Sequence, residues 1–201
     1  MSIQKQVCQF KVTLLEIEPA IWRRIVVPAS YTFWDLHVAI QDSMGWLDYH
    51  LHLFRVTDLE TGTREEIGIP DEDRFEDDVQ CVPSWEKPIT DYFREPGTRA
   101  EYLYDFGDDW QHELELEAIR ERIPKRRYPI CEGGARACPP EDCGGVPGYF
   151  DFLRILNDPA DDEHETIERW LGRPYDPNAF DPKKVHFDDP RKRWEFAFRN
   201  A

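Results

Sequence analysis

Two predicted β-hairpins constrain the fold of this chain more than any other feature of its sequence. Residues 7–17 are rich in β-forming side chains, and residues 21–27 follow a proline-containing break with the period-two pattern of a strand, so the two segments are expected to pair. Residues 99–106 and 110–119 alternate in the same way across a Gly-Asp-Asp turn. The sequence therefore predicts a mainly antiparallel sheet with a buried face that needs a covering layer.

The covering layer is predicted from a helical pattern that starts at Thr32. Thr32 followed by Asp35 comes close to a capping box, apolar residues then follow helical spacing, and Gly45 ends the helix. Shorter strands are expected at residues 51–56 and 67–69, irregular structure at 70–87 and 131–148, and further helices at 149–156, 162–171 and 189–198. This order predicts an α+β fold with a mainly antiparallel sheet, a packed N-terminal helix and a helical C-terminal lobe.

The length of 201 residues suits one domain with a buried core. We expect a sheet-plus-helix lobe at residues 1–123 and, at residues 124–201, a lobe that holds a cysteine-rich loop and the later helices. Aromatic residues make up 13% of the chain, too many for a disordered acidic protein. No apolar run approaches the ~20 residues of a membrane helix, and the first residues lack the apolar region of a secretory signal. We therefore expect a cytoplasmic protein with no membrane partner.

The formal net charge of −16, from 41 acidic residues against 25 Lys and Arg, argues against a general nucleic-acid binder. The excess concentrates in residues 61–120, and much of it lies in residues 71–78, where we expect a solvated acidic loop. Basic patches at residues 23–24, 125–127 and 191–193 interrupt the acidity. They are expected to be solvated or to form internal ion pairs, and the alternative is a local contact with DNA.

The five cysteines are expected to be free thiols, because an odd number without a secretory signal does not suggest a disulfide framework. Cys131, Cys138 and Cys143 lie in a Gly- and Pro-rich segment, residues 131–148, which we name the cysteine loop. Thiolates at short spacing can converge on zinc, and His112, on a strand shortly before the loop, is our choice of fourth ligand. The alternatives are packed thiols in a loop ordered by its own ion pairs, or a reactive thiol.

His50 and His52 are two residues apart in a predicted strand, so their side chains should share one face, where they could chelate a metal. Asp105 and Asp108 flank a glycine, where a tight turn explains them, and the alternative is a carboxylate pair that binds a cation. The enzyme hypothesis places these four residues and His112 around a cation, as in a metal-assisted hydrolase or a nuclease-like protein. No nucleophile, phosphate-loop, dinucleotide or metalloprotease motif occurs in the sequence.

Five phrases of the sequence are specific when they are taken together and in order. They lie at residues 21–24, 35–37, 45–54, 104–112 and 137–145. With them the chain resembles the plasmid pRiA4b ORF-3-like family of bacterial and archaeal proteins, and the resemblance covers most of residues 10–181. The matching positions are Trp22, Arg23, Arg24, His37, Trp46, His50, His52, Asp105, Gly107, Asp108, Trp110, His112, Cys138, Pro139, Pro140, Glu141, Asp142, Cys143 and Gly144.

The resemblance implies that family's compact α+β fold but no mechanism, because the family is of unknown function. Some members carry an insertion-element and resolvase-like label, yet neither Ser2 nor Ser30 has the arginine-rich setting of a resolvase nucleophile. The residues expected to have structural roles are Trp22, Arg23, Arg24, Gly107, Pro139, Pro140, Glu141, Asp142 and Gly144.

The leading hypothesis is a non-enzymatic binding or regulatory domain associated with plasmids or mobile elements, with an unidentified protein or small ligand as its partner. The predicted binding groove is lined by His37, Trp46, His50, His52, Asp105, Asp108 and Trp110. The alternatives are the metal-assisted enzyme and a DNA-contacting accessory factor associated with a resolvase. Zinc in the cysteine loop is the one cofactor that the sequence suggests.

Overall fold

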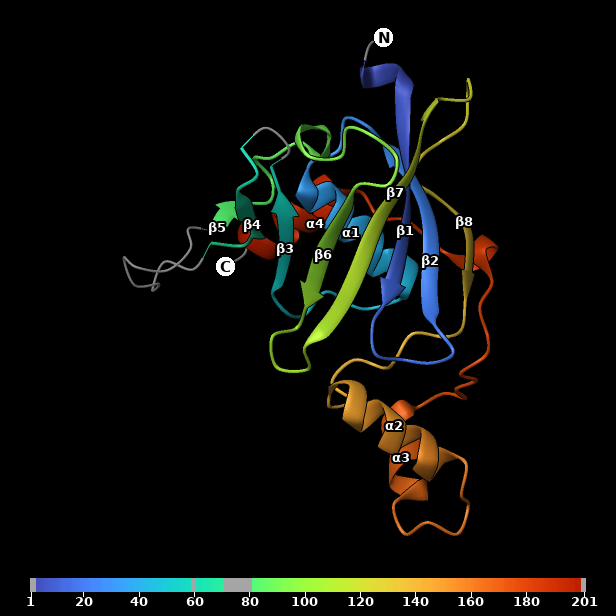
Figure 1. The fold of residues 1–201 in the computed structure, drawn as a ribbon. Coiled ribbons are helices and arrows are strands. Elements are labelled where there is room, and N and C mark those ends of the chain that lie inside the picture. The colour runs from blue at the N-terminus through green and yellow to red at the C-terminus, as the bar shows by residue number, and fades with distance from the viewer. Residues whose placement is uncertain (1–2, 59–60, 71–80, 200–201) are drawn as a thin grey trace.

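The computed structural model describes residues 3–58, 61–70 and 81–199, and the acidic stretch at residues 71–78 lies outside them. An eight-stranded sheet in the order β5-β4-β3-β6-β7-β1-β2-β8 forms the body of the described chain (Figure 1). Its strands are β1 (Gln6–Leu14), β2 (Ile21–Pro28), β3 (His52–Thr57), β4 (Arg64–Gly68), β5 (Cys81–Pro83), β6 (Arg99–Tyr104), β7 (Trp110–Glu121) and β8 (Ile130–Ala135). The helices are α1 (Phe33–Met44), α2 (Gly145–Leu156), α3 (His164–Leu171) and α4 (Pro190–Arg199), with 3-10 turns at Ile3–Lys5, Ile89–Asp91 and Pro182–Lys184.

The two hairpins predicted from the sequence are confirmed. β1 pairs antiparallel with β2, and β6 pairs antiparallel with β7. β1 and β7 also pair with each other, so the two hairpins meet in the middle of the sheet. Among the described strands only β4 and β5 pair in parallel, which agrees with the prediction of a mainly antiparallel α+β fold.

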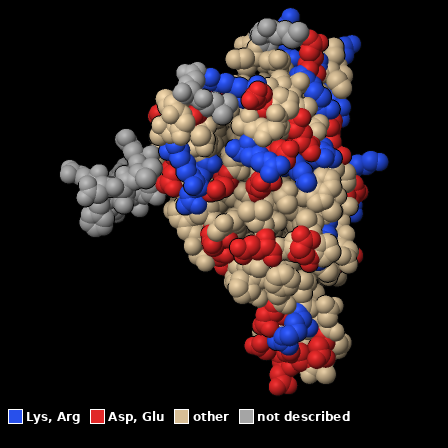
Figure 2. Space-filling view, in the orientation of Figure 1, with Lys and Arg blue, Asp and Glu red and all other residues tan. Residues whose placement is uncertain are grey.

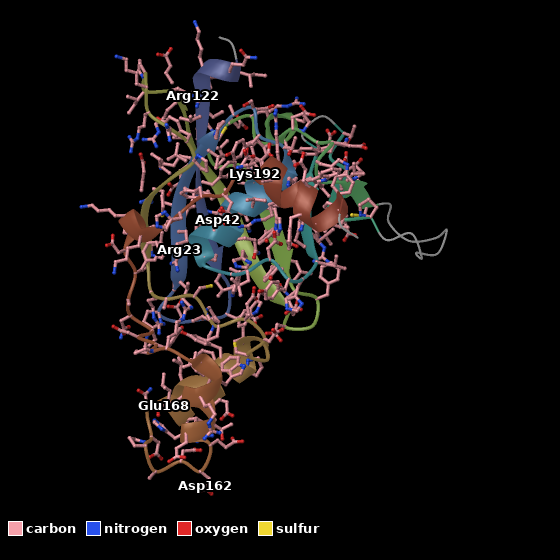
Figure 3. The ribbon with its side chains drawn as sticks, turned by 180° about the vertical axis from the view of Figure 1, so that it is seen from behind. Arg23, Asp42, Arg122, Asp162, Glu168 and Lys192 are labelled. Atoms are coloured by element: carbon pink, nitrogen blue, oxygen red, sulfur yellow. The ribbon has the colours of Figure 1, made fainter. Side chains whose placement is uncertain are left out.

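Helix α1 covers the inner face of the sheet, and its ends follow the predicted signals. The Thr32 hydroxyl accepts a hydrogen bond from the Asp35 backbone N–H, and the Asp35 carboxylate accepts one from the Thr32 N–H, which completes the capping box. Gly45 ends the helix in the left-handed region, with φ of 94°. Nearly all of α1 is buried, because the sheet lies on one side of it and α4 on the other (Figure 3).

The C-terminal helices occupy two different places. α2 and α3 pack on each other and project away from one end of the sheet, with Asp162, between the two helices, at the far tip (Figures 1 and 3). α4 returns to the body of the molecule and packs against α1. None of the described helices combines the length and the apolar composition that crossing a membrane requires.

The prediction of irregular structure throughout residues 131–148 is wrong at both ends, because β8 includes residues 131–135 and α2 begins at Gly145. The glycines that suggested a loop serve close packing instead. A Cβ at Gly134 would lie 2.7 Å from the Trp22 carbonyl oxygen on β2 and would also meet the Phe180 ring. Glycine therefore lets Phe180 pack directly on the edge strand.

The outer face of the sheet carries cross-strand ion pairs, which appear as adjoining blue and red patches in Figure 2. Arg99 on β6 contacts Glu113 and Glu115 on β7 at 3.1 and 3.0 Å. Arg24 on β2 donates two hydrogen bonds, of 2.6 and 2.7 Å, to Glu117 on β7. The Arg99 pairs join the neighbouring strands β6 and β7 and favour their pairing, whereas the Arg24 pair reaches across β1, so several acidic residues of β7 are compensated within the sheet.

Candidate functional site

Three potential metal ligands converge at the end of the sheet nearest α2. His50 lies just before β3, Asp105 follows β6 directly, and Asp142 belongs to the cysteine loop. The His50 Nε2 lies 2.9 Å from the Asp142 Oδ1 and 3.5 Å from the Asp105 Oδ2. One ligand atom from each residue lies within 4.8 Å of the others, a grouping that no other three His, Cys, Asp or Glu residues of the described chain match. We name these three residues the cation cluster.

A tight turn orients the Asp105 carboxylate. Asp105 adopts a positive φ of 56°, and its backbone N–H donates to the Leu51 carbonyl at 3.0 Å. Its Oδ1 accepts hydrogen bonds from the backbone N–H groups of Gly107 and Asp108, at 2.9 and 3.3 Å. The turn that the sequence predicted therefore occupies one carboxylate oxygen and leaves the other facing His50.

The cysteine loop brings Asp142 to the cluster by docking on the same turn. The Gly144 backbone N–H donates to the Asp108 Oδ2 at 3.1 Å. A Cβ at Gly145, where φ is 67°, would collide with the Asp108 backbone carbonyl. These two glycines let the loop backbone lie directly against residues 105–109, and this contact sets the position of Asp142.

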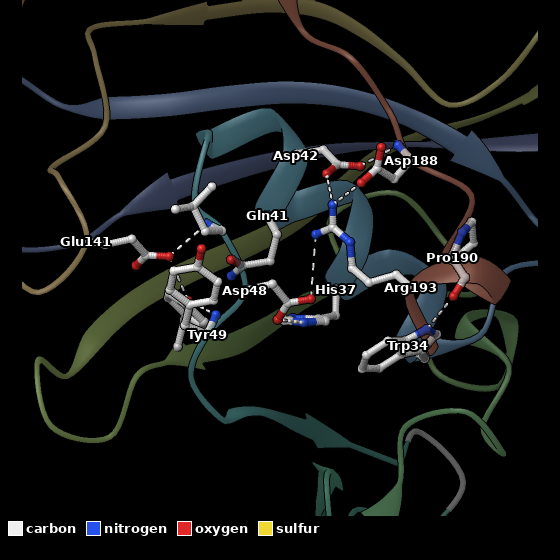
Figure 4. Close-up of polar contacts among 12 residues, drawn as sticks. Trp34, His37, Gln41, Asp42, Asp48, Tyr49, Glu141, Asp188, Pro190 and Arg193 are labelled. Atoms are coloured by element: carbon white, nitrogen blue, oxygen red, sulfur yellow. Dashed lines mark hydrogen bonds and ion pairs between the residues drawn. The ribbon is translucent and has the colours of Figure 1, made fainter. Parts of the chain in front are cut away.

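Glu141 joins the loop to the segment that carries His50. Its Oε1 accepts hydrogen bonds from the Leu47 backbone N–H at 2.7 Å and from the Tyr104 hydroxyl at 3.0 Å (Figure 4). Its Oε2 is buried with no partner in the described part of the chain. Burial raises the pKa of the Glu141 carboxyl, and the hydrogen bonds from Leu47 and Tyr104 partly offset this.

Four of the residues predicted to line an open groove are instead in the core. His37, Trp46, His52 and Trp110 are all buried. The Trp46 ring packs against Trp110, with centroids 5.9 Å apart, and its Nε1–H donates to the Pro139 carbonyl at 3.0 Å. Asp105 is also buried, at 7% exposed, so only His50 and Asp108 of the predicted groove are partly exposed.

His37 and His52 form a stacked pair, with ring centroids 3.6 Å apart. His37 lies between the Tyr102 hydroxyl, at 2.8 Å, and the Asp48 carboxylate, at 2.7 Å, and Asp48 in turn faces Arg193 of α4 at 3.5 Å (Figure 4). Neither ring nitrogen of His52 has a partner within the described chain. Burial lowers the pKa of His52 well below its ordinary value, with His37 adding to the effect. The ring therefore stays neutral and packs as part of the core.

The predicted zinc site is not assembled. No three of Cys131, Cys138, Cys143 and His112 bring ligand atoms within 4.8 Å of one another, in a stretch that the structure describes fully. The Cys131 thiol donates to the Gly133 carbonyl at 3.3 Å. Burial raises the pKa of Cys138, and it raises that of Cys143 to about 12, so these thiols stay protonated at neutral pH. His112 is fully buried, with its Nδ1 3.3 Å from the Tyr102 carbonyl oxygen.

Arg23 acts inside the fold. Its guanidinium donates to the carbonyls of Ser43, Trp22 and Ala135 at 2.8, 2.9 and 2.9 Å, and it lies over the Phe180 ring. It is buried at the inner face of β2, close to the end of α1. The sequence predicts that the basic patch at residues 23–24 is solvated or forms internal ion pairs. The structure shows such an ion pair for Arg24, whose partner is Glu117.

The sequence left one ligand of the cation cluster and its surroundings unrecognised. Asp142 was assigned a structural role, because nothing local shows that the cysteine loop folds back to His50. Leu47, Tyr49, Leu51 and Phe106 are between 48% and 71% exposed and were not singled out. The alternation of apolar and polar residues from 47 to 51 was the available signal.

Comparisons with known proteins agree with the described fold. The uncharacterised protein y4hQ from Sinorhizobium fredii (strain NBRC 101917 / NGR234) is 33% identical over 192 residues, and the match covers 94% of each chain. The crystal structure of a protein of unknown function from Methanosarcina mazei Go1 is 43% identical, with a TM-score of 0.82, and the match covers 90% of this chain and 98% of that chain. The sequence profile described as plasmid pRiA4b ORF-3-like protein matches residues 6–184. This chain therefore belongs to the plasmid pRiA4b ORF-3-like protein family.

Proposed function

We propose that this protein is a binding domain whose recognition site holds a divalent cation between His50, Asp105 and Asp142. The observation that carries the proposal is the convergence of three ligand atoms, from segments far apart in the sequence, within 4.8 Å of one another. One imidazole and two carboxylates suit zinc, manganese or iron. Three protein ligands leave further coordination positions for a group of the partner, such as a carboxylate.

The arrangement of charges around the cation cluster supports the binding of a cation there. Two carboxylates face a single imidazole, and the unpartnered Glu141 Oε2 is buried nearby. Because burial raises the pKa of Glu141, a positive charge close to it would stabilise its ionised form. A bound divalent cation would therefore offset the repulsion among these carboxylates.

Exposed apolar side chains next to the cluster support a binding role. Leu47, Tyr49 and Leu51 alternate along the segment that carries His50, and Phe106 follows Asp105. Apolar side chains exposed together typically mark surfaces that contact a ligand or another protein. We expect a partner that presents an apolar surface around the group that completes the cation's coordination.

Isothermal titration of the chelator-treated full chain with Zn²⁺ and with Mn²⁺ tests the proposal. We expect one ion per chain, and a loss of affinity of at least about tenfold in Asp105→Asn and in Asp142→Asn. Asp109→Asn is the matched control, because Asp109 lies in the same turn but outside the cluster and accepts a hydrogen bond from Gln111. An unsaturable wild-type titration, or equal losses in the control and the two cluster variants, would contradict the proposal.

A second candidate function, metal-assisted hydrolysis, is favoured by Glu141. A buried carboxylate oxygen without a partner, and with a raised pKa, has the properties of a general base for a metal-bound water. Turnover of an activated phosphodiester that requires the metal and is lost in Glu141→Gln would support an enzyme. Metal binding without such turnover would leave the binding domain as the function.

The DNA-contacting alternative has less support. Arg23 donates to backbone carbonyls in the core, Arg24 pairs with Glu117, and Arg193 pairs with carboxylates of α1 and its neighbouring loop. These engaged side chains leave a smaller basic surface for phosphate groups. A cytoplasmic location and an association with plasmids or mobile elements stay predictions, and the plasmid reading frame in the family's description is what supports the latter.

A further inference from the structure

We propose that a cavity between the cysteine loop and the α2–α3 hairpin binds a small organic cation, an ammonium or guanidinium group carried on an apolar body. The cavity has a volume of about 240 Å³. This is slightly below the ~300–1,000 Å³ typical of sites for drug-sized ligands. Its size therefore fits a short amine or a single basic side chain. The cavity adjoins the cation cluster and shares only Asp142 with it, and the proposal does not depend on a bound metal.

The walls of the cavity supply apolar contact. Phe152 and Ile155 of α2 are each 3% exposed, and Ile167 of α3 lies opposite them in the lining. Trp170 of α3 is 47% exposed and packs edge-to-face on Phe152, with ring centroids 6.2 Å apart. A half-exposed indole at the rim of an apolar cavity can cover a ligand's hydrocarbon part and attract its positive charge through the ring face.

The charged groups of the lining select for a cation. Asp142, Asp151 and Glu163 are the three ionisable carboxyls in it, and no lysine or arginine is among the lining residues. Asp151 is compensated by Arg154 at 2.8 Å and Asp142 faces His50, whereas Glu163 has no ion pair with any residue that the structure describes. The lining therefore includes one exposed carboxylate without an ion pair, together with a half-exposed indole.

The remaining polar group of the lining does not add a competing charge. The Cys143 thiol is half-buried in the lining and carries no positive charge that would compete with a cationic ligand. Asp142 lines this cavity and also belongs to the cation cluster, so the two sites are neighbours. The cavity differs in its chemistry from the cation cluster, because Phe152, Ile155, Ile167 and Trp170 give it an apolar lining and no histidine is among its lining residues.

Binding of phenethylamine to the chelator-treated full chain, measured by titration calorimetry, tests the proposal. The neutral isostere 2-phenylethanol should bind about tenfold more weakly, because it lacks the interaction with the carboxylate and the indole face. Glu163→Gln should weaken the binding of phenethylamine about threefold, as expected for the loss of a solvent-exposed ion pair. Glu165→Gln, an exposed α3 residue outside the lining, is the control and should leave affinity unchanged.

A blocked lysine, Nα-acetyl-lysine methylamide, provides the second arm. Tighter binding of this probe than of phenethylamine assigns the site to a basic side chain of a partner, and the reverse order assigns it to a free amine. Equal binding of phenethylamine and 2-phenylethanol, unchanged binding in Glu163→Gln, or no saturation at ~10 mM probe, which corresponds to ~3 kcal/mol or less, would each overturn the proposal. Metal titration of Glu163→Gln separates the two sites, because the cation cluster is intact in that variant.

Discussion

Replacing Arg193 by alanine tests how α4 is held to the rest of the molecule. The Arg193 guanidinium contacts the Asp42 carboxylate at 2.7 Å, the Asp48 carboxylate at 3.5 Å and also Asp188 (Figure 4). Asp42 lies on α1 and Asp48 just beyond it, so one side chain joins the last helix to the helix that covers the sheet. Arg193→Ala removes this link and leaves the largely buried carboxylates of Asp42 and Asp48 without their cationic partner.

The magnitude follows from burial. Removing one partner of a buried ion pair costs ~3–5 kcal/mol, because the other charge stays desolvated. Here the Arg193 side chain is 17% exposed and that of Asp188 is 64% exposed, so solvent screens part of the loss. We expect the free energy of unfolding to fall by ~2 kcal/mol. Burial raises the pKa of Asp42 and Arg193 opposes that rise, so removal of Arg193 leaves the desolvation of this carboxylate less compensated.

Urea unfolding followed by far-ultraviolet circular dichroism measures the change. Arg191→Ala is the matched control, since Arg191 is an exposed residue of the same helix. In the Arg193→Ala background, Asp42→Asn should cost ~1 kcal/mol less than in the wild type, because it removes the uncompensated charge. A loss below ~0.5 kcal/mol in Arg193→Ala, within the range of ordinary surface substitutions, would refute the reasoning, as would additive effects in the double variant.

Three further predictions concern the core. Arg23→Met should lower the free energy of unfolding by ~3 kcal/mol in urea titrations, because three backbone carbonyls lose their buried charged donor. Gly134→Ala should lower the melting temperature by several degrees, through a loss of ~1–3 kcal/mol, since its Cβ would collide with the β2 backbone. His52 and His112, the latter with its pKa lowered to about 4, are neutral when folded and gain a proton on unfolding. Stability should therefore fall as pH drops from ~6.5 towards ~4, by ~1.4 kcal/mol per pH unit for each histidine that remains neutral in the folded state, and a flat pH profile of unfolding would contradict this.

The parts of the fold that the sequence predicted are those with local signals. The capping box at Thr32, the left-handed glycine at position 45 and the alternation of β6 and β7 each depend on residues close together in the chain. The sequence does not predict β8, because Gly133 and Gly134 weaken a strand prediction, and Gly134 is required there by the close approach of the Trp22 carbonyl and the Phe180 ring. The return of α4 to α1 involves contacts between distant residues, such as Arg193 with Asp42 and the Pro190 carbonyl with Trp34, which are 151 and 156 residues apart in the chain.

The residues of the candidate site also divide into those that local sequence signals identify and those that depend on distant contacts. The sequence identified His50 and Asp105 as possible cation ligands from residue type and turn chemistry. It could not identify Asp142 as the third, because that position depends on how Gly144 and Gly145 dock on the β6–β7 turn. The ligands proposed for zinc are not grouped in the structure for a related reason, since short spacing between cysteines does not by itself bring their thiols together.

The segment that carries His50 is held from both sides, and this links the two C-terminal elements to the cation cluster. On one side Asp48 is bound by His37 and by Arg193 of α4, and on the other Leu47 donates to Glu141 of the cysteine loop. Neither Arg193 nor Glu141 is a ligand, yet both fix the backbone next to one. Arg193→Ala should therefore weaken metal binding as well as stability, whereas Arg191→Ala should change neither. Full metal affinity in a folded Arg193→Ala protein would show that the cysteine loop alone positions His50.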